Sequence, residues 1–187
     1  MSAVLESERL ALRPFVDTDA DAVQAYAGHA GNVDYMQWGP NTIEQTRSFL
    51  SDVIWKGRAD PRTNYDFAVT LRFSGHLIGA CGIYLDAELT QGHLGWILHR
   101  DYWHNGYGTE MGGALLRFGF DELKLHRIWA TCNAENYGSF RVMERNGMRR
   151  EAQLVESRYG KVHGQPRWYD EYEYAILANE WRTGITL

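Results

Sequence analysis

A strand that leads into a glycine-started helix constrains the fold of this chain more than any other feature. Gly92 to Leu98 has the apolar pattern of a strand, and Gly106-Tyr107-Gly108 follows it and opens a helix expected to reach Leu123. Arg127 to Cys132 then has the pattern of a second strand. Two strands joined through a helix pair in parallel, so this segment predicts a sheet with a helix packed on its face.

The other segments predict a mixed, mostly antiparallel sheet in one domain covering residues 1–187. Short turns between successive apolar strands are typical of an antiparallel meander. Thr42 with Gln45 forms a capping box that begins a helix, and Asn146-Gly147 is a signal for a helix end. We expect strands at 8–13, 65–71, 77–85, 92–98, 127–132, 148–157 and 168–177, and helices at about 17–29, 42–56, 106–123 and 136–145. The fold class is therefore α/β (α+β), with about seven strands flanked by about four helices and a loop over 158–168.

Gly106 and Gly108 predict an anion site at the start of the helix. Glycine lets the backbone approach a ligand closely, and the first helical turn has unpaired N–H groups with partial positive charge. A phosphate or pyrophosphate suits such a site. A dinucleotide is disfavoured, because Met111 replaces the third glycine and no carboxylate follows the next strand. A Walker-type loop is excluded because no Gly-Lys-Ser/Thr follows.

Composition excludes several classes of partner. The chain has 19 Lys and Arg against 24 Asp and Glu, a net charge of −5, so nucleic acid is not expected. No apolar run could span a membrane, and the N-terminus has no secretory pattern. The histidines lack metal-ligand spacing, so no metal is expected. Cys81 and Cys132 lie in apolar segments and are expected to be buried, reduced thiols of a cytoplasmic protein.

Four motifs, in order and at matching distances, resemble the GNAT acetyltransferases, in particular the RimJ/RimL type that acetylates ribosomal-protein N-termini. The motifs are xRLxLRPF at Glu8–Phe15, hLIGxxG at Leu77–Gly82, GWxLxxxYWxxGYGTE at Gly95–Glu110 and NxxNxxSxRVxERNGM at Asn133–Met148. The resemblance extends over about residues 7 to 181. It implies a GNAT fold and acetyl transfer from acetyl-CoA to a primary amine, by direct attack in a ternary complex.

The resemblance also implies where coenzyme A is held. The cofactor loop and the following helical turn correspond to Trp103, His104, Asn105, Gly106, Tyr107, Gly108 and Thr109. Trp103 stands where the family more often has Gln or Arg. The backbone of Ile97 and Leu98 is expected to pair with the pantetheine arm. Asn136 is expected to hydrogen-bond that arm, and Ser139 to lie near the thioester sulfur.

Two departures from the family affect the catalytic assignments. Met143 stands where many members use a tyrosine, so Ser139 is the candidate acid, or else a small residue that lets the cofactor approach. Arg158 stands where the closest relatives have a glutamate. Glu156, expected on the same strand face, is the candidate base, or else a solvated carboxylate. These departures keep open a non-catalytic acyl-CoA sensor or scaffold as the alternative.

The acceptor is expected to bind between the loops 32–41 and 158–168. Tyr35, Met36, Trp38 and Trp168 would line an aromatic cleft. Asp34 and Glu44 could attract a cationic amine, whereas Trp38-Gly-Pro could equally be a structural corner. The expected partner is a small-molecule or peptide amine; a protein N-terminus, a small amine and an antibiotic amine stay open. A homodimer is compatible with the sequence.

Overall fold

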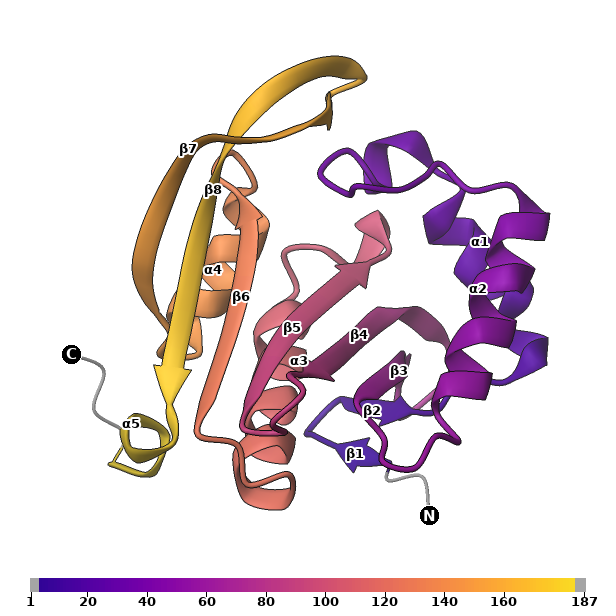
Figure 1. Ribbon diagram of the computed structural model, residues 1–187. Helices are drawn as coiled ribbons and strands as arrows, with labels where there is room; N and C mark the ends of the chain where they lie inside the picture. The colour runs from indigo at the N-terminus through magenta and orange to yellow at the C-terminus, as the bar shows by residue number, and fades with distance from the viewer. Residues whose placement is uncertain (1–3, 184–187) are drawn as a thin grey trace.

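The computed structural model describes residues 4–183, whose strands all join one eight-stranded sheet. The strand order is β1-β2-β3-β4-β5-β6-β8-β7, and every neighbouring pair is antiparallel except β5 and β6 (Figure 1). The strands are β1 (Leu5–Glu6), β2 (Leu10–Arg13), β3 (Asn64–Leu71), β4 (Leu77–Leu85), β5 (Gln91–Leu98), β6 (Arg127–Asn133), β7 (Arg149–Val162) and β8 (Gln165–Leu177). The mixed, mostly antiparallel sheet is confirmed. The two residues of β1 are too few to show an alternation in the sequence.

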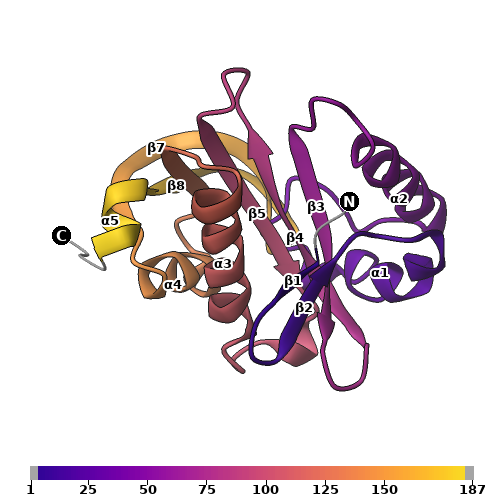
Figure 2. The ribbon, with the colours of Figure 1, turned by 90° about the horizontal axis from the view of Figure 1, so that it is seen from below.

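Helices cover both faces of the sheet (Figure 2). One face carries α1 (Ala20–Ala27) and α2 (Ile43–Lys56), and the other carries α3 (Tyr107–Arg117) and α4 (Tyr137–Arg145). The short α5 (Ala178–Thr183) follows β8, and α3 continues into a π-helical turn at Phe118–Glu122. Single 3-10 turns occur at Asp17–Asp19, Ala30–Asn32 and Arg100–Tyr102.

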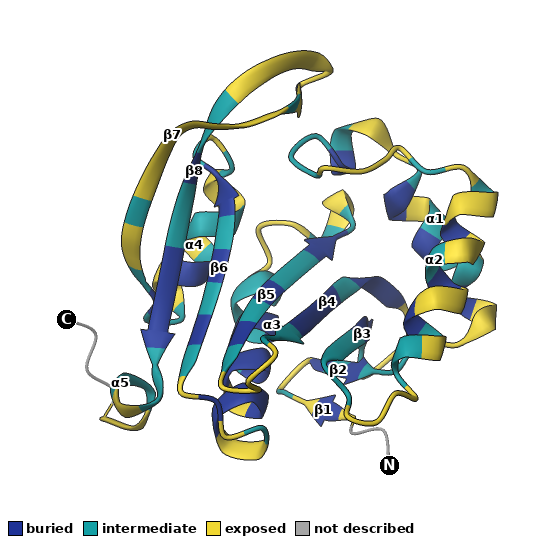
Figure 3. Ribbon diagram, viewed as in Figure 1, coloured by how far each residue is buried: buried dark blue, intermediate teal, exposed yellow. Residues whose placement is uncertain are grey.

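Two apolar cores lie on the two faces of the sheet. Phe67 of β3 and Leu115 of α3 belong to the larger core, whereas Ala68 of β3 and Leu50 of α2 belong to the smaller one. Consecutive residues of β3 therefore serve opposite cores, as the alternation of a strand requires. The outward sides of α2 and most of β7 are exposed (Figure 3).

The sequence signals predicted to begin one helix and to end another are confirmed. Thr42 accepts a hydrogen bond from the Gln45 backbone at 3.3 Å, and the Gln45 side chain accepts one from the Thr42 N–H at 2.8 Å. After α4, Gly147 has a φ of 76°, the left-handed conformation that ends a helix. Within residues 4–183, no helix is long and apolar enough to span a membrane.

The sheet is open between β5 and β6. These strands pair only from Gln91 to His93 and from Arg127 to Trp129, although β5 continues to Leu98. Beyond that point the two strands diverge, so the β6-facing backbone groups of β5 are not used by a strand ladder. The parallel pair and the intervening α3 confirm the strand–helix–strand unit.

The expected loop over 158–168 is wrong. β7 and β8 form one long hairpin that extends to Val162 and resumes at Gln165 (Figure 1). Gly160 and Pro166 are turn-forming residues, but here they face Arg167 and Lys161 in the ladder. Both residues are thus held in register within the strand ladder, which overrides local preference.

Candidate active site

A cavity of about 960 Å³ lies at the gap between β5 and β6. Its lining combines residues from both faces of the sheet. From the α3–α4 side come Gly106, Tyr107, Gly108, Thr109, Asn136, Ser139, Val142 and Arg145. From the α1–α2 side come Tyr26, Tyr35, Met36, Trp38, Asp66 and Tyr84. A cavity with such a lining connects the two faces through the open sheet.

The start of α3 has the geometry expected of an anion site. Gly106 is the N-cap with a φ of 80°, a conformation that strongly favours glycine, and no side chain caps the first turn. The first turn therefore presents free N–H groups to the cavity. Gly108 has a packing role as well, because a Cβ there would lie 2.8 Å from Cγ2 of Val142 on α4.

Trp103 ties the loop before α3 to the end of β5. Its indole N–H donates to the Leu98 carbonyl at 2.8 Å, and the side-chain amide of Asn32 donates to the same oxygen at 3.0 Å. The Asn32 Oδ1 also accepts the Arg100 N–H at 2.6 Å. The Leu98 carbonyl is therefore occupied by the protein.

The backbone direction of β5 decides which groups face the gap. His99 donates to the Ile78 carbonyl at 2.7 Å, toward β4. Backbone groups alternate in direction along a strand, so those of Ile97 also face β4, whereas those of Trp96 and Leu98 face the gap. Ile97 lines the cavity through its other atoms. The backbone N–H groups that face the gap belong to its neighbours, Trp96 and Leu98.

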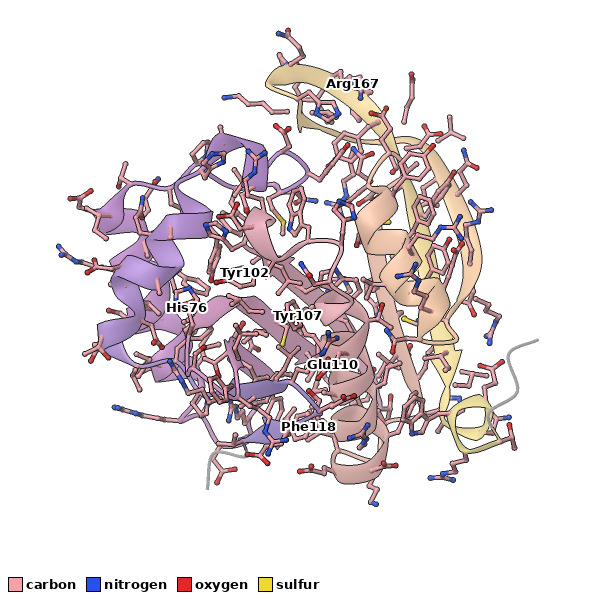
Figure 4. All side chains as sticks on the ribbon, turned by 180° about the vertical axis from the view of Figure 1, so that it is seen from behind. His76, Tyr102, Tyr107, Glu110, Phe118 and Arg167 are labelled. Atoms are coloured by element: carbon pink, nitrogen blue, oxygen red, sulfur yellow. The ribbon has the colours of Figure 1, made fainter. Side chains whose placement is uncertain are left out.

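Asn105 supports the loop from outside the lining of the cavity. Its side chain donates to the Trp103 carbonyl at 2.8 Å, and its own carbonyl accepts from Arg9 at 3.0 Å. Arg9, which directly precedes β2, also pairs with Glu110 at 2.7 Å and lies over the ring of Tyr107. Figure 4 labels Tyr107 and Glu110, which both belong to α3. His104 does line the cavity, with a φ of 61°.

Asn136 and Ser139 meet at the start of α4. The Asn136 Oδ1 accepts the Ser139 N–H at 3.1 Å, which caps the helix, and both residues line the cavity. Burial raises the pKa of Cys132 to about 12, and a hydrogen bond with the Ser139 side chain offsets part of that rise. The Cys132 thiol is thus protonated at neutral pH, next to the Ser139 hydroxyl.

The aromatic residues of the loop 32–41 reach the cavity, but Trp168 does not. Tyr35, Met36 and Trp38 line it. Trp168 is 56% exposed and packs against Tyr159, with ring centroids 5.5 Å apart. The expectation that placed it in the cleft depended on a loop, and the extended hairpin directs it elsewhere.

The hairpin tip contacts the loop 32–41. His163 lies 3.2 Å from the Tyr35 hydroxyl and 3.1 Å from the Asp34 carboxylate. Arg167 and Glu135 form an ion pair near the same end, and Figure 4 labels Arg167 on the arching hairpin. These contacts bridge over the acceptor side of the cavity. Neither Asp34 nor Glu44 is among the lining residues.

Glu156 does not lie at the cavity. The register of β7 against β8 shifts between Leu154 and Arg158, and Glu156 has a φ of 43° within this bulge. The side chain is exposed, and its N–H donates to Asp170 at 2.9 Å. The bulge breaks the alternation on which the expected shared face with Arg158 depends. Arg158 itself pairs with Glu171 at 2.8 Å.

Three lining residues that the sequence pattern did not single out carry polar chemistry. The Tyr84 hydroxyl donates to Asp66 at 2.7 Å, and His93 lies beside Tyr84 on the next strand. Burial raises the pKa of Asp66 and lowers that of His93. Alternation within each strand indicates the face of each residue, but only the strand register brings the three together.

Residues with an unpaired polar atom gather around this cavity. Within residues 4–183, three buried side-chain polar atoms have no hydrogen-bond partner: the Tyr26 hydroxyl, His93 Nε2 and Asn133 Nδ2. All three residues line the cavity. The three atoms themselves are covered by neighbouring protein atoms, so the residues face the cavity with their other atoms. No group of potential metal ligands occurs in the described part of the chain.

Comparisons with known proteins agree with this geometry. The family described as "Acetyltransferase (GNAT) domain" matches residues 9–149. The uncharacterized N-acetyltransferase YnaD of Bacillus subtilis is 35% identical over 95% of this chain and 98% of its own length. A crystal structure of a GNAT-family acetyltransferase from Bacillus anthracis has 35% identity and a TM-score of 0.82, over 95% of this chain and 100% of that one. RimL, a ribosomal-protein acetyltransferase in complex with coenzyme A, shares the fold at 16% identity, with a TM-score of 0.80 over 94% of this chain and 98% of its own.

The family match and the named relatives show that this chain is an acyltransferase. The chain belongs to the GNAT acetyltransferase family, and its relatives include proteins named N-acetyltransferases. Ribosomal-protein acetyltransferases are among the proteins that share its fold.

Proposed function

We propose that the protein transfers an acetyl group from acetyl-CoA to a primary amine within a ternary complex. The observation that carries this proposal is the convergence of three features on one cavity: the free first turn of α3, the capped start of α4 and the gap beside β5. The cavity spans both faces of the sheet, so two substrates can meet in it. The cofactor complex of RimL, a protein of the same fold, agrees with this proposal.

The residues present fit coenzyme A. The N–H groups of Tyr107, Gly108 and Thr109 would hold the pyrophosphate at the start of α3. The gap-facing N–H groups of Trp96 and Leu98, with the free amide nitrogen of Asn136, would hold the pantetheine arm. Arg145, which lines the cavity, adds a cation on the phosphate side. When bound, acetyl-CoA supplies an acetyl group activated as a thioester.

Transfer forms a C–N bond and breaks the C–S bond, so the amine loses a proton and the thiolate gains one. We assign donation of the proton that the thiolate gains to the Ser139 hydroxyl, which lines the cavity. His93 replaces Glu156 as our candidate for accepting the proton that the amine loses. Its imidazole is neutral at pH 7 because burial lowers its pKa, and the residue lines the cavity.

Thiol release from acetyl-CoA, measured with a panel of small amines and N-terminal peptides, tests this function. We expect release that depends on an acceptor, and a product whose mass is increased by one acetyl group. Binding of coenzyme A by calorimetry, without release for any acceptor, would instead support an acyl-CoA sensor. Loss of both binding and release would remove the cofactor assignment.

A further inference from the structure

Two facing glycines leave room for a tyrosine ring on the acceptor side of the sheet. Gly82 of β4 and Gly95 of β5 are direct register partners. A Cβ at Gly82 would lie 2.7 Å from the Tyr84 hydroxyl oxygen, and one at Gly95 would lie 3.5 Å from the Tyr84 ring. The Tyr84 ring therefore lies along the sheet over both glycines. Its hydroxyl reaches Asp66 on β3 and fixes that carboxylate at the edge of the cavity.

Asp66 lacks a cationic partner in the described part of the protein. The nearby cations are engaged elsewhere: Lys56 pairs with Asp52 at 2.7 Å, and Arg62 donates to the Asn64 carbonyl at 2.8 Å. The Tyr84 hydroxyl is the one side-chain donor to Asp66 within residues 4–183. Burial raises the pKa of Asp66, which Tyr84 and the more distant cations only partly offset. A cation bound in the cavity would supply the missing partner.

Asp66 lies away from the gap where acetyl transfer would occur. It is on β3, two strands from β5, and neighbouring strands are about 4.8 Å apart, which gives roughly 10 Å between the two backbones. That separation is too long for a direct contact between Asp66 and an amine attacking beside β5. It suits a second group of the same acceptor molecule.

We infer that Asp66, held by Tyr84, is an anionic subsite for a second protonated group on the acceptor, which makes the preferred acceptor a small diamine. This inference rests on the proposed function. The contacts of His163 with Tyr35 and Asp34 bridge the acceptor side, which favours a small molecule over a folded protein. The aromatic lining from Tyr35 and Trp38 would pack against the apolar chain between the two amines.

Alkyl diamines compared with monoamines of the same chain length test the subsite. For the wild-type protein we expect KM to be at least about tenfold lower for the diamine, since a hydrogen-bonded charge pair contributes on that scale. Asp66→Asn keeps the shape and an acceptor for Tyr84, so it should remove this preference by raising the KM of the diamine to about that of the monoamine. Asp121→Asn, at an exposed position of the π-helical turn, is the matched control.

A second variant and a second readout separate the possible failures. Tyr84→Phe keeps the ring over the glycines but frees Asp66, so it should raise the diamine KM a few-fold without changing kcat. Diamine binding to the coenzyme A-loaded protein, measured by calorimetry, should be weakened at least about tenfold by Asp66→Asn. Equal diamine affinity of wild type and Asp66→Asn, both folded by thermal melting, would overturn the subsite. Absent thiol release with retained, Asp66-dependent diamine binding would overturn the transferase proposal and not the subsite.

Discussion

The indole N–H of Trp103 donates to the carbonyl of Leu98 at 2.8 Å, five residues back along the chain. This bond links the loop that precedes α3 to the end of β5, and it occupies the Leu98 carbonyl oxygen beside the gap between β5 and β6. It explains how a tryptophan can stand where other family members have Gln or Arg: the side chain positions the loop, and the N–H groups that would hold the phosphates belong to the backbone.

Trp103→Phe should therefore weaken coenzyme A binding without unfolding the protein. Loss of one partly buried hydrogen bond contributes about 1 kcal/mol, or roughly a fivefold rise in Kd. Calorimetry with coenzyme A measures this change. Trp55→Phe, at a side chain that is 71% exposed, is the control and should bind as the wild type does. An unchanged Kd in Trp103→Phe would mean that the loop holds its shape without this bond.

Gly108 serves packing and cofactor binding at the same position, and a compensating variant can separate the two. Gly108→Ala brings a Cβ to 2.8 Å from Val142, and such overpacking typically costs about 1–3 kcal/mol of unfolding free energy. Val142→Ala should restore most of that stability in the double variant, as measured by urea unfolding. If the added methyl also obstructs the pyrophosphate, coenzyme A affinity should stay low in the double variant despite its restored stability.

Ser139→Ala tests the assignment of the leaving-group acid. The helix cap uses the backbone N–H of Ser139, so the variant should fold and bind coenzyme A normally. We expect kcat to fall by about tenfold or more if the hydroxyl protonates the thiolate. A kcat near that of the wild type would assign Ser139 to close packing alone. Glu156→Gln, outside the cavity, should leave both kcat and the pH profile unchanged.

The pH dependence of kcat/KM should report His93. Burial lowers the pKa of this imidazole, so the neutral, proton-accepting form persists below the ordinary value of about 6.5. Activity should fall as the pH drops through this lowered pKa and should be flat above it. His93→Asn should abolish that acidic limb and reduce turnover. His126→Asn, at an exposed histidine, provides the comparison and should keep the limb in place.

Features encoded over a few neighbouring residues could be predicted from the sequence. The left-handed Gly106, the capping box at Thr42 and the helix end at Gly147 each depend on a local conformational preference. Four of the five strands before α3 were predicted within a few residues, because each is a largely apolar segment bounded by turn residues. The parallel pair followed from the helix between its strands.

Features that depend on strand register could not be predicted. Asp66, Tyr84 and His93 lie on three successive strands and meet only because β3, β4 and β5 pair in one particular register. The bulge that displaces Glu156 gives no clear signal in the sequence, since it arises from how β7 fits β8. Gly160 and Pro166 favour turns locally, but the pairing of β7 with β8 holds both of them in strands.

The early separation of β5 from β6 has a kinetic consequence. A molecule held against α3 and α4 and a molecule held below α1 and α2 approach each other through the sheet, from opposite sides. The two molecules would therefore contact different sets of the lining residues. We therefore expect a random order of substrate binding, in which a high concentration of either substrate does not inhibit binding of the other.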